Sequence, residues 1–206
     1  MDYLANGVLG YLIGSVSFGL IVGRIWSQRD IRELGSGKTG ATNVLRTAGR
    51  IPAVIVVAAD IAKGAVPALM GRVVFDSDGV AAFGAGAAVM GHIWPLFFGF
   101  RGGRGVATTF GGVLGLSPLV SLLFPLLAVA LLVPTRIVSV MSVVGCPIAA
   151  GLVAVLAVLG EQPAAYAWYS LFAVLLVEYK HIPNIRRLIA GTEPRMGRGG
   201  ERPATG

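Results

Sequence analysis

Long apolar runs separated by short polar segments make up most of this chain. A helix needs about 20 apolar residues to cross a bilayer, and seven runs are candidates. They are Tyr3–Trp26, Ile51–Gly71, Gly79–Phe100, Val106–Leu116, Pro118–Val133, Ile137–Leu159 and Ala164–Tyr179. The fourth run is too short for a full crossing and is interpreted as a short helix inside the bundle. The pattern predicts an all-α, polytopic membrane bundle of about seven helices, with six or five spans as alternatives.

The composition agrees with a membrane location. Of the 206 residues, 55% are hydrophobic and 13% are charged, and the mean hydropathy is +0.77. Soluble domains carry about 25% charged residues. We expect one domain, 1–194, without an internal repeat, and a basic, disordered cytoplasmic tail, 195–206. The single cysteine, Cys146, lies in an apolar run and is expected to be a buried hydrophobic residue.

The charges predict the orientation of the bundle. Asp2 and the lack of any Lys or Arg before Arg24 do not fit the basic start of a signal peptide, so we expect Met1–Val22 to be a retained span. With the N-terminus outside, all 17 lysines and arginines except Lys63 and Arg72 fall on the inner side. This is the positive-inside pattern, and it predicts an inner C-terminus. The same sidedness explains the net charge of +7 without a nucleic-acid partner.

The first polar stretch of interest is Gly35–Arg46, Gly-Ser-Gly-Lys-Thr-Gly-Ala-Thr-Asn-Val-Leu-Arg. Exposed backbone N–H groups of a glycine loop, followed by a helix, favour phosphate binding. A nucleotide motif is not expected, because a buried strand is missing before the loop and Arg32 occupies a required glycine position. A flexible connector is the structural alternative. The candidate phosphate-binding residues are Gly35, Ser36, Gly37, Lys38, Gly40, Thr42, Asn43 and Arg46, with Thr42 or Asn43 as the expected N-cap.

A second glycine loop with cations precedes the fourth apolar run. Arg101, Gly102, Gly103 and Arg104 are expected to form another anion cradle at a helix start. Two such loops on one face indicate two phosphate groups, or one phosphate held from both sides. Within the second run, Asp60 and Lys63 have i, i+3 spacing, which predicts an internal ion pair without direct substrate contact.

The third stretch is His181–Glu193. Pro183 near a start and Gly191 as a stop predict a short amphipathic helix at the membrane surface. His181 and Asn184 lie on one face of it at i, i+3 spacing, pointing toward the glycine loops. The histidine has either a structural or an acid–base role.

These three stretches together resemble the PlsY family of membrane acyl-phosphate glycerol-3-phosphate acyltransferases. Residues 35–46 match the first family motif except that Lys38 replaces Asn. Residues 91–108 match the second with Arg101 and Arg104 in place of two lysines, and residues 181–193 match the third except for Ile182 in place of Arg. The resemblance extends from Gly14 to Glu193.

The resemblance implies transfer of a fatty acyl group from acyl phosphate to the 1-hydroxyl of sn-glycerol 3-phosphate. The products are 1-acylglycerol 3-phosphate, a lysophosphatidic acid, and phosphate, in phospholipid biosynthesis. It implies a multi-pass protein of the bacterial inner membrane with a cytoplasmic active site, acting as a monomer in membrane lipid, without cofactor or metal.

The same resemblance suggests roles for the candidate residues. Ser36, His181 and Arg104 are the expected catalytic residues. The Gly35–Asn43 loop is expected to bind the acyl-phosphate group, and Arg46, Arg104 and Asn184 the glycerol 3-phosphate. Either His181 or the phosphate oxygens of the donor take the hydroxyl proton. A small anion transporter or channel is the alternative of a different class, since glycine loops at helix ends also bind substrates there.

Overall fold

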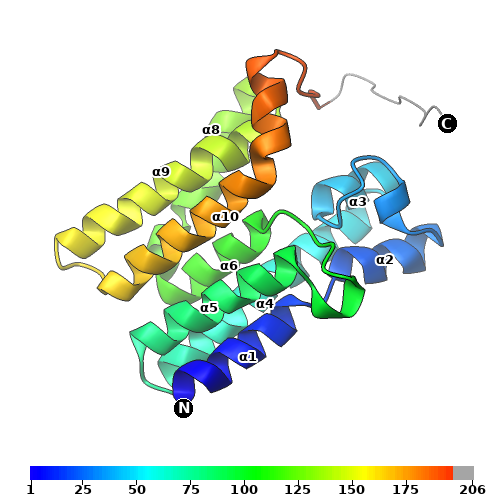
Figure 1. The fold of residues 1–206 in the computed structure, drawn as a ribbon. Helices are drawn as coiled ribbons and strands as arrows, with labels where there is room; N and C mark the ends of the chain where they lie inside the picture. Colours follow the sequence, from blue (N-terminus) through cyan, green and yellow to red (C-terminus); the bar gives the residue numbers. More distant parts are fainter. Residues whose placement is uncertain (197–206) are drawn as a thin grey trace.

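The computed structural model describes residues 1–196, which form helices and connecting turns without a strand (Figure 1). This confirms the all-α prediction. The elements are α1 (Asp2–Gly14), α2 (Phe18–Ser27), η1 (Ile31–Glu33), α3 (Ala41–Thr47), α4 (Arg50–Val73), α5 (Asp78–Ile93), η2 (Leu96–Phe98), α6 (Val106–Leu116), α7 (Pro118–Ser121), α8 (Leu123–Thr135), α9 (Val138–Val158) and α10 (Ala164–Ile189). From residue 197 on, the tail predicted at 195–206 lies outside the described residues.

The first apolar run, predicted as one membrane span, consists of two helices separated by a break. α1 ends at Gly14 and α2 begins at Phe18. In the break, the Val16 carbonyl accepts a hydrogen bond from the Lys63 ammonium, and the Ser15 hydroxyl accepts one from the Leu96 N–H. Side-chain partners of this kind replace the helical hydrogen bonds and make an interruption possible at membrane depth.

The last helix also differs from the prediction. α10 continues through Pro183 to Ile189, so a separate amphipathic helix starting near Pro183 is wrong. Proline removes one helical hydrogen bond, and α10 accommodates Pro183 at an exposed position without ending there. The predicted stop is correct, because Gly191 has a φ of +68° immediately after the helix.

Within residues 1–196, five segments are long and apolar enough to cross a membrane: Asp2–Ser27, Arg50–Val73, Asp78–Phe98, Pro118–Thr135 and Val138–Val158. α6 is a shorter apolar helix, in agreement with its predicted place inside the bundle. α10 has 26 residues, but its second half carries several charged side chains. The predicted total of seven membrane helices, and the orientation of the bundle, therefore stay predictions.

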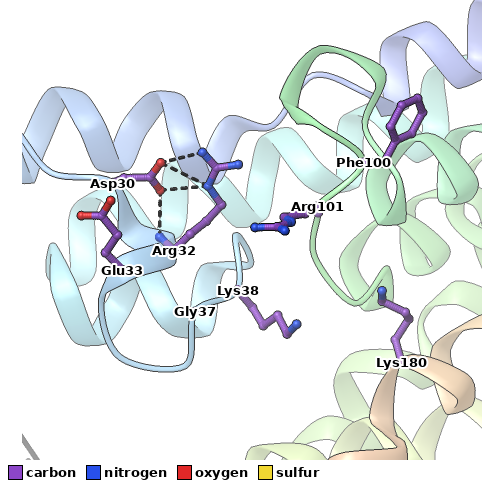
Figure 2. Close-up of a pocket in the computed structure, with 9 residues that line it drawn as sticks. Asp30, Arg32, Glu33, Gly37, Lys38, Phe100, Arg101 and Lys180 are labelled. Carbon is purple, nitrogen blue, oxygen red and sulfur yellow. Dashed lines mark hydrogen bonds and ion pairs between the residues drawn. The ribbon is translucent and has the colours of Figure 1, made fainter. Parts of the chain in front are cut away.

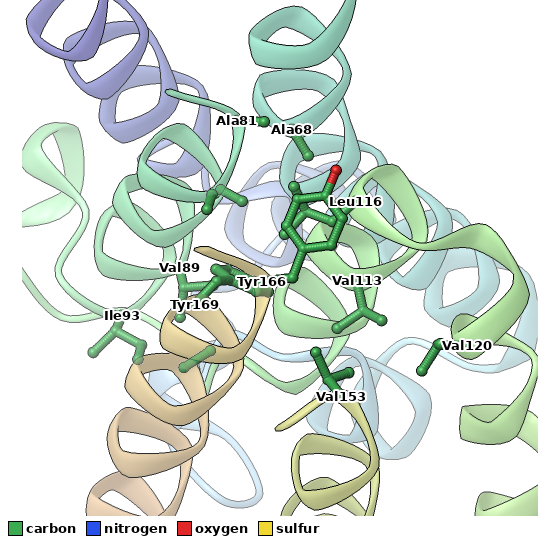
Figure 3. Packing of buried hydrophobic residues seen from close by; sticks show 13 residues of the cluster. Ala68, Ala81, Val89, Ile93, Val113, Leu116, Val120, Val153, Tyr166 and Tyr169 are labelled. Atoms are coloured by element: carbon green, nitrogen blue, oxygen red, sulfur yellow. The ribbon is translucent and has the colours of Figure 1, made fainter. Parts of the chain in front are cut away.

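Small residues bring the central helices close together. Side chains added at Gly10 or Gly14 of α1 would overlap the backbone of α5, and one at Gly64 of α4 would overlap the Thr108 carbonyl of α6. Membrane helices pack by such close approach, because lipid provides little hydrophobic driving force between them. A buried cluster including Val89, Val113, Val153 and Tyr169 then joins α5, α6, α9 and α10 (Figure 3).

Peripheral helices complete the molecule. α8 has no buried residue within the described part of the chain, as expected for a helix facing lipid. At the other side, Leu20, Ile31, Val44 and Val56 form a second cluster. This cluster fixes α2, η1 and α3 against α4 and thereby sets the position of the first glycine loop.

Candidate active site

The three polar stretches lie toward one end of the bundle, away from the N-terminus (Figure 1). The first is held together by one side chain. Asn43 donates hydrogen bonds to the carbonyls of Ile31, Leu34 and Lys38 at 2.8–3.1 Å, and its Oδ1 accepts one from the Ser36 N–H at 2.8 Å. Asn43 thus fixes the path of the backbone on both sides of the glycines.

The start of α3 differs from the prediction. Gly40, not Thr42 or Asn43, is the N-cap residue, because the Asn43 amide turns back into the loop. Gly35 and Gly37 have φ values of +57° and +67°, which favour glycine. Gly40 has a φ of −78°, which residues other than glycine also adopt.

The second loop is bound to the end of α5. The N–H groups of Gly102 and Gly103 donate to the carbonyls of Ile93 and His92, both at 3.2 Å. These N–H groups are therefore not free for an anion, which corrects the predicted backbone cradle. Gly105 has a φ of +89° and caps α6. Among the groups predicted for this cradle, the side chains of Arg101 and Arg104 therefore remain as candidates for anion binding.

An open pocket of about 520 Å³ lies between the two loops and α10 (Figure 2). The Arg101 side chain extends toward the loop that carries Lys38, and Lys180 approaches from α10. Asp30 is paired with Arg32 at 2.6 Å, and hydrogen bonds from Arg32 hold the pKa of Asp30 below its usual 3.8. The pocket is lined by Asp30, Arg32, Glu33, Gly37, Lys38, Phe100, Arg101, Gly102 and Lys180.

Lys180 was missed as a pocket residue by sequence reasoning. It precedes His181, and it was counted only among the cations that predict the inner side of the membrane. A usable signal was its i, i+4 spacing from Asn184, since residues four apart lie on the same face of a helix.

A second group of candidate residues surrounds Arg104. Burial lowers the pKa of this guanidinium, Glu193 raises it, and Arg187 and Arg46 lower it. Arg104 Nε is buried without a hydrogen-bond partner among residues 1–196. The guanidinium groups of Arg46, Arg104 and Arg187 outnumber the single carboxylate of Glu193. The excess of positive charge favours a bound anion.

His181 and Asn184 belong to this second group. His181 is 1% exposed, and its Nδ1 lies 2.8 Å from the Val177 carbonyl oxygen. Asn184 donates to Glu193 Oε1 at 2.6 Å, while its own Oδ1 is buried without a partner in the described chain. The free polar atom of Asn184 is thus an acceptor, which suits a substrate hydroxyl better than a phosphate oxygen.

Glu193 is a further residue that sequence reasoning left without a role. It also accepts hydrogen bonds from Ser139 at 2.6 Å and from Arg187 at 2.7 Å. Burial raises the pKa of Glu193, but the hydrogen bonds from Ser139, Asn184 and Arg187 outweigh burial, so the pKa lies below its usual 4.5. Glu193 therefore joins α9 to the end of α10.

The predicted residues do not all meet at one point. Gly37, Lys38, Arg101 and Gly102 line the pocket, whereas Ser36 does not. Arg46, Arg104, His181 and Asn184 make up the second group. Within residues 1–196, no group of three His, Cys, Asp or Glu side chains is arranged to hold a metal ion.

The predicted internal ion pair is present. Lys63 Nζ lies 2.8 Å from Asp60 Oδ1 within α4. His92 of α5 joins the pair, with Nδ1 3.6 Å from the same oxygen. All three side chains are nearly fully buried.

The fold and the site define an all-helical membrane protein with cationic groups suited to phosphate ligands. The family model described as "Glycerol-3-phosphate acyltransferase" matches residues 4–191. The glycerol-3-phosphate acyltransferase of Halalkalibacterium halodurans is 44% identical over 190 residues, covering 91% of this chain and 92% of the relative. That of Parasynechococcus marenigrum is 45% identical over 189 residues, covering 92% and 87%.

Two solved structures have the same fold. The crystal structure of PlsY (YgiH), an integral membrane glycerol 3-phosphate acyltransferase, in its glycerol 3-phosphate form has a TM-score of 0.87 and 37% identity. A second form of PlsY, with lysophosphatidic acid, has a TM-score of 0.86 and 35% identity. Each alignment covers 96% of both chains. The chain belongs to the PlsY family of glycerol-3-phosphate acyltransferases.

Proposed function

We propose that this acyltransferase uses acyl phosphate as donor and esterifies the 1-hydroxyl of glycerol 3-phosphate. The products are 1-acylglycerol 3-phosphate and inorganic phosphate. The observation that carries the proposal is the presence of two cationic groups on the same end of the bundle, one in the open pocket and one around Arg104. Both substrates carry phosphate, so a reaction between them needs two such sites.

The loop Gly35–Asn43, with Lys38, is proposed to bind the phosphate of the donor. Lys38, Arg101 and Lys180 surround the pocket in which that phosphate would lie. Glycerol 3-phosphate binds Arg46 and Arg104 through its phosphate, and the acceptor atom Asn184 Oδ1 receives a hydrogen bond from one of its hydroxyls. Charge-assisted bonds of arginine to phosphate are the strong and directional type.

The reaction requires a hydroxyl oxygen to attack the acyl carbonyl carbon. The carbon–oxygen bond to the phosphate then breaks, and phosphate leaves with the bonding electron pair. His181 takes the hydroxyl proton at Nε2 and passes it to the departing phosphate. Arg104 stabilises negative charge on the donor and the leaving group, and Ser36 contributes a hydroxyl donor from the loop.

The site is proposed to face the cytoplasm of a bacterial cell, with the protein in the inner membrane. The support is the sidedness of the cations, which accumulate on the end of the bundle that carries the pocket. A monomer is proposed, since each proposed substrate-binding residue comes from a single chain. The lipid donor reaches the site from the membrane and glycerol 3-phosphate from the cytoplasm.

Purified protein in detergent tests the donor. Labelled glycerol 3-phosphate is supplied with palmitoyl phosphate, palmitoyl coenzyme A or palmitoyl acyl carrier protein in separate reactions. We expect lysophosphatidic acid, with one phosphate released per ester, from acyl phosphate alone. Equal turnover with a thioester donor contradicts the proposal, and glycerol 3-phosphate uptake by proteoliposomes without ester formation favours an anion transporter.

A further inference from the structure

A buried cluster of three polar side chains joins α4 and α5. Asp60, Lys63 and His92 are 2%, 3% and 6% exposed. The carboxylate is shared by the ammonium at 2.8 Å and by the histidine Nδ1 at 3.6 Å. Charged groups at membrane depth are costly and are retained where they pair or act. The contacts at each end of the cluster indicate what this one does.

Lys63 connects the cluster to the start of α2, which in turn lies against the first loop. Its ammonium donates to the Val16 carbonyl at 3.1 Å, in the break between α1 and α2, and lies 5.9 Å from the centre of the Phe18 ring. Next to Phe18, a side chain on Gly19 would overlap the Thr39 carbonyl of the first loop. The start of α2 therefore lies against both Lys63 and the Thr39 backbone.

His92 connects the cluster to the second loop. Its carbonyl accepts the Gly103 N–H at 3.2 Å. A side chain on Gly103 would overlap the imidazole itself, at Nε2. The ring therefore lies directly against the residue that precedes Arg104. Any rotation of the imidazole changes the space available to this part of the loop.

We propose that Asp60, Lys63 and His92 are positioning residues that set the spacing between the two glycine loops, and through it the spacing between the two substrate phosphates. The inference rests on the proposed function, because that function supplies the two phosphates. Asp60 is the common partner, so a change at either end of the cluster reaches the opposite loop. None of the three side chains lines the pocket, so their effect on the reaction is indirect.

A charge exchange tests the proposal. In Asp60→Lys/Lys63→Asp, the two charges still neutralise one another at i, i+3 spacing, but an aspartate at 63 has no proton to donate to the Val16 carbonyl. If the ion pair is purely structural, the double variant should regain both the stability and the turnover that the single variants Asp60→Lys and Lys63→Asp lose. We expect the double variant to regain the melting temperature that the single variants lose. Its kcat should stay about 10²-fold below that of the wild type, the scale of a 1 Å misplacement of reacting groups.

If the double variant does not fold, a milder variant tests the proposal instead. His92→Asn keeps a donor near the Nδ1 position and removes the part of the ring that lies against Gly103. We expect kcat to fall at least about tenfold, by the same sensitivity of turnover to misplacement. We also expect Gly103→Ala to cost less activity in the His92→Asn variant than in the wild type. The smaller asparagine leaves space for the added methyl group.

A matched control separates positioning from general loosening. Asn6 is also fully buried and donates to the carbonyls of Pro67 and Val80, in α4 and α5. Asn6→Ser should lower the melting temperature and leave the kcat of the folded protein unchanged. Wild-type kcat in His92→Asn, or an equal fall in Asn6→Ser, overturns the inference. If the wild type itself fails to use acyl phosphate, the proposed function fails instead.

Discussion

His181 Nδ1 faces the carbonyl oxygen of Val177 at 2.8 Å, one turn earlier in α10. A carbonyl only accepts, so Nδ1 carries a proton and donates it. In the neutral imidazole, Nε2 is then left with a lone pair. The helix backbone thus selects the tautomer that a base or hydrogen-bond acceptor requires at the far side of the ring.

This tautomer leads to a prediction for His181. A glutamine amide can replace Nε2 in hydrogen bonding but cannot take the proton. We expect His181→Gln to lower kcat by about 10²- to 10⁴-fold, the usual contribution of general acid–base catalysis, with a smaller change in the KM for glycerol 3-phosphate. Steady-state kinetics check this. Nearly unchanged kcat would assign the proton to the donor phosphate and leave His181 an orienting role.

The second prediction concerns Arg46. Arg46→Ala should raise the KM for glycerol 3-phosphate more than the KM for acyl phosphate. Loss of a charge-assisted contact costs about 2–3 kcal/mol, which corresponds to roughly 30- to 150-fold. Arg50 is likewise exposed, so Arg50→Ala is the matched control for net charge. The same KM increase in both variants would indicate a general electrostatic effect and remove Arg46 from the site.

The first glycine loop gives a third prediction. Gly37 has a φ of +67°, where a side chain costs about 1–2 kcal/mol. Gly37→Ala should therefore reduce kcat/KM for acyl phosphate at least as much as Ser36→Ala does. Gly40 has an ordinary φ and open space around it, so Gly40→Ala should reduce kcat/KM less than Gly37→Ala. The reverse order would contradict a role for backbone shape.

The fourth prediction is a pH dependence of stability. The pKa of Glu193 is lowered from its usual 4.5 by its hydrogen-bond partners. A depressed pKa adds stability above the unfolded value, and this stability is lost as pH falls from about 4.5 through the folded pKa. The melting temperature of the wild type should therefore converge on that of Glu193→Gln as pH drops below about 4. A gap that stays constant down to pH 3 would exclude this contribution.

The fifth prediction tests the orientation. Cysteines replacing Ser36 and Arg101 should react with a membrane-impermeant thiol reagent from the inner side alone, and one replacing Glu161 from outside. The basis is the distribution of cations. The wild type is the control, because Cys146 is buried. Reaction of either of the first two from outside in sealed cells would reverse the orientation.

Apolar periodicity and charge predicted the helices and the clustering of three polar stretches at one end. They missed the features that depend on contacts between distant segments. In the break at Val16, the carbonyl accepts a hydrogen bond from Lys63, which lies 47 positions along the chain. In the second loop, the N–H groups of Gly102 and Gly103 donate hydrogen bonds to the end of α5 and are not free. Glu193 joins two helices because it accepts a hydrogen bond from Ser139, 54 positions away. No local pattern encodes such partners.

Asn43 has a consequence for the thermodynamics of substrate binding. Its amide connects four backbone groups of the first loop before any ligand is present. Ordering of a flexible loop normally reduces affinity, because the conformational entropy is lost when the ligand binds. Here that entropy is lost once, during folding. Phosphate should therefore bind the wild type with little change in loop hydrogen exchange, whereas an Asn43→Ala loop would rigidify on binding and show a more unfavourable binding entropy.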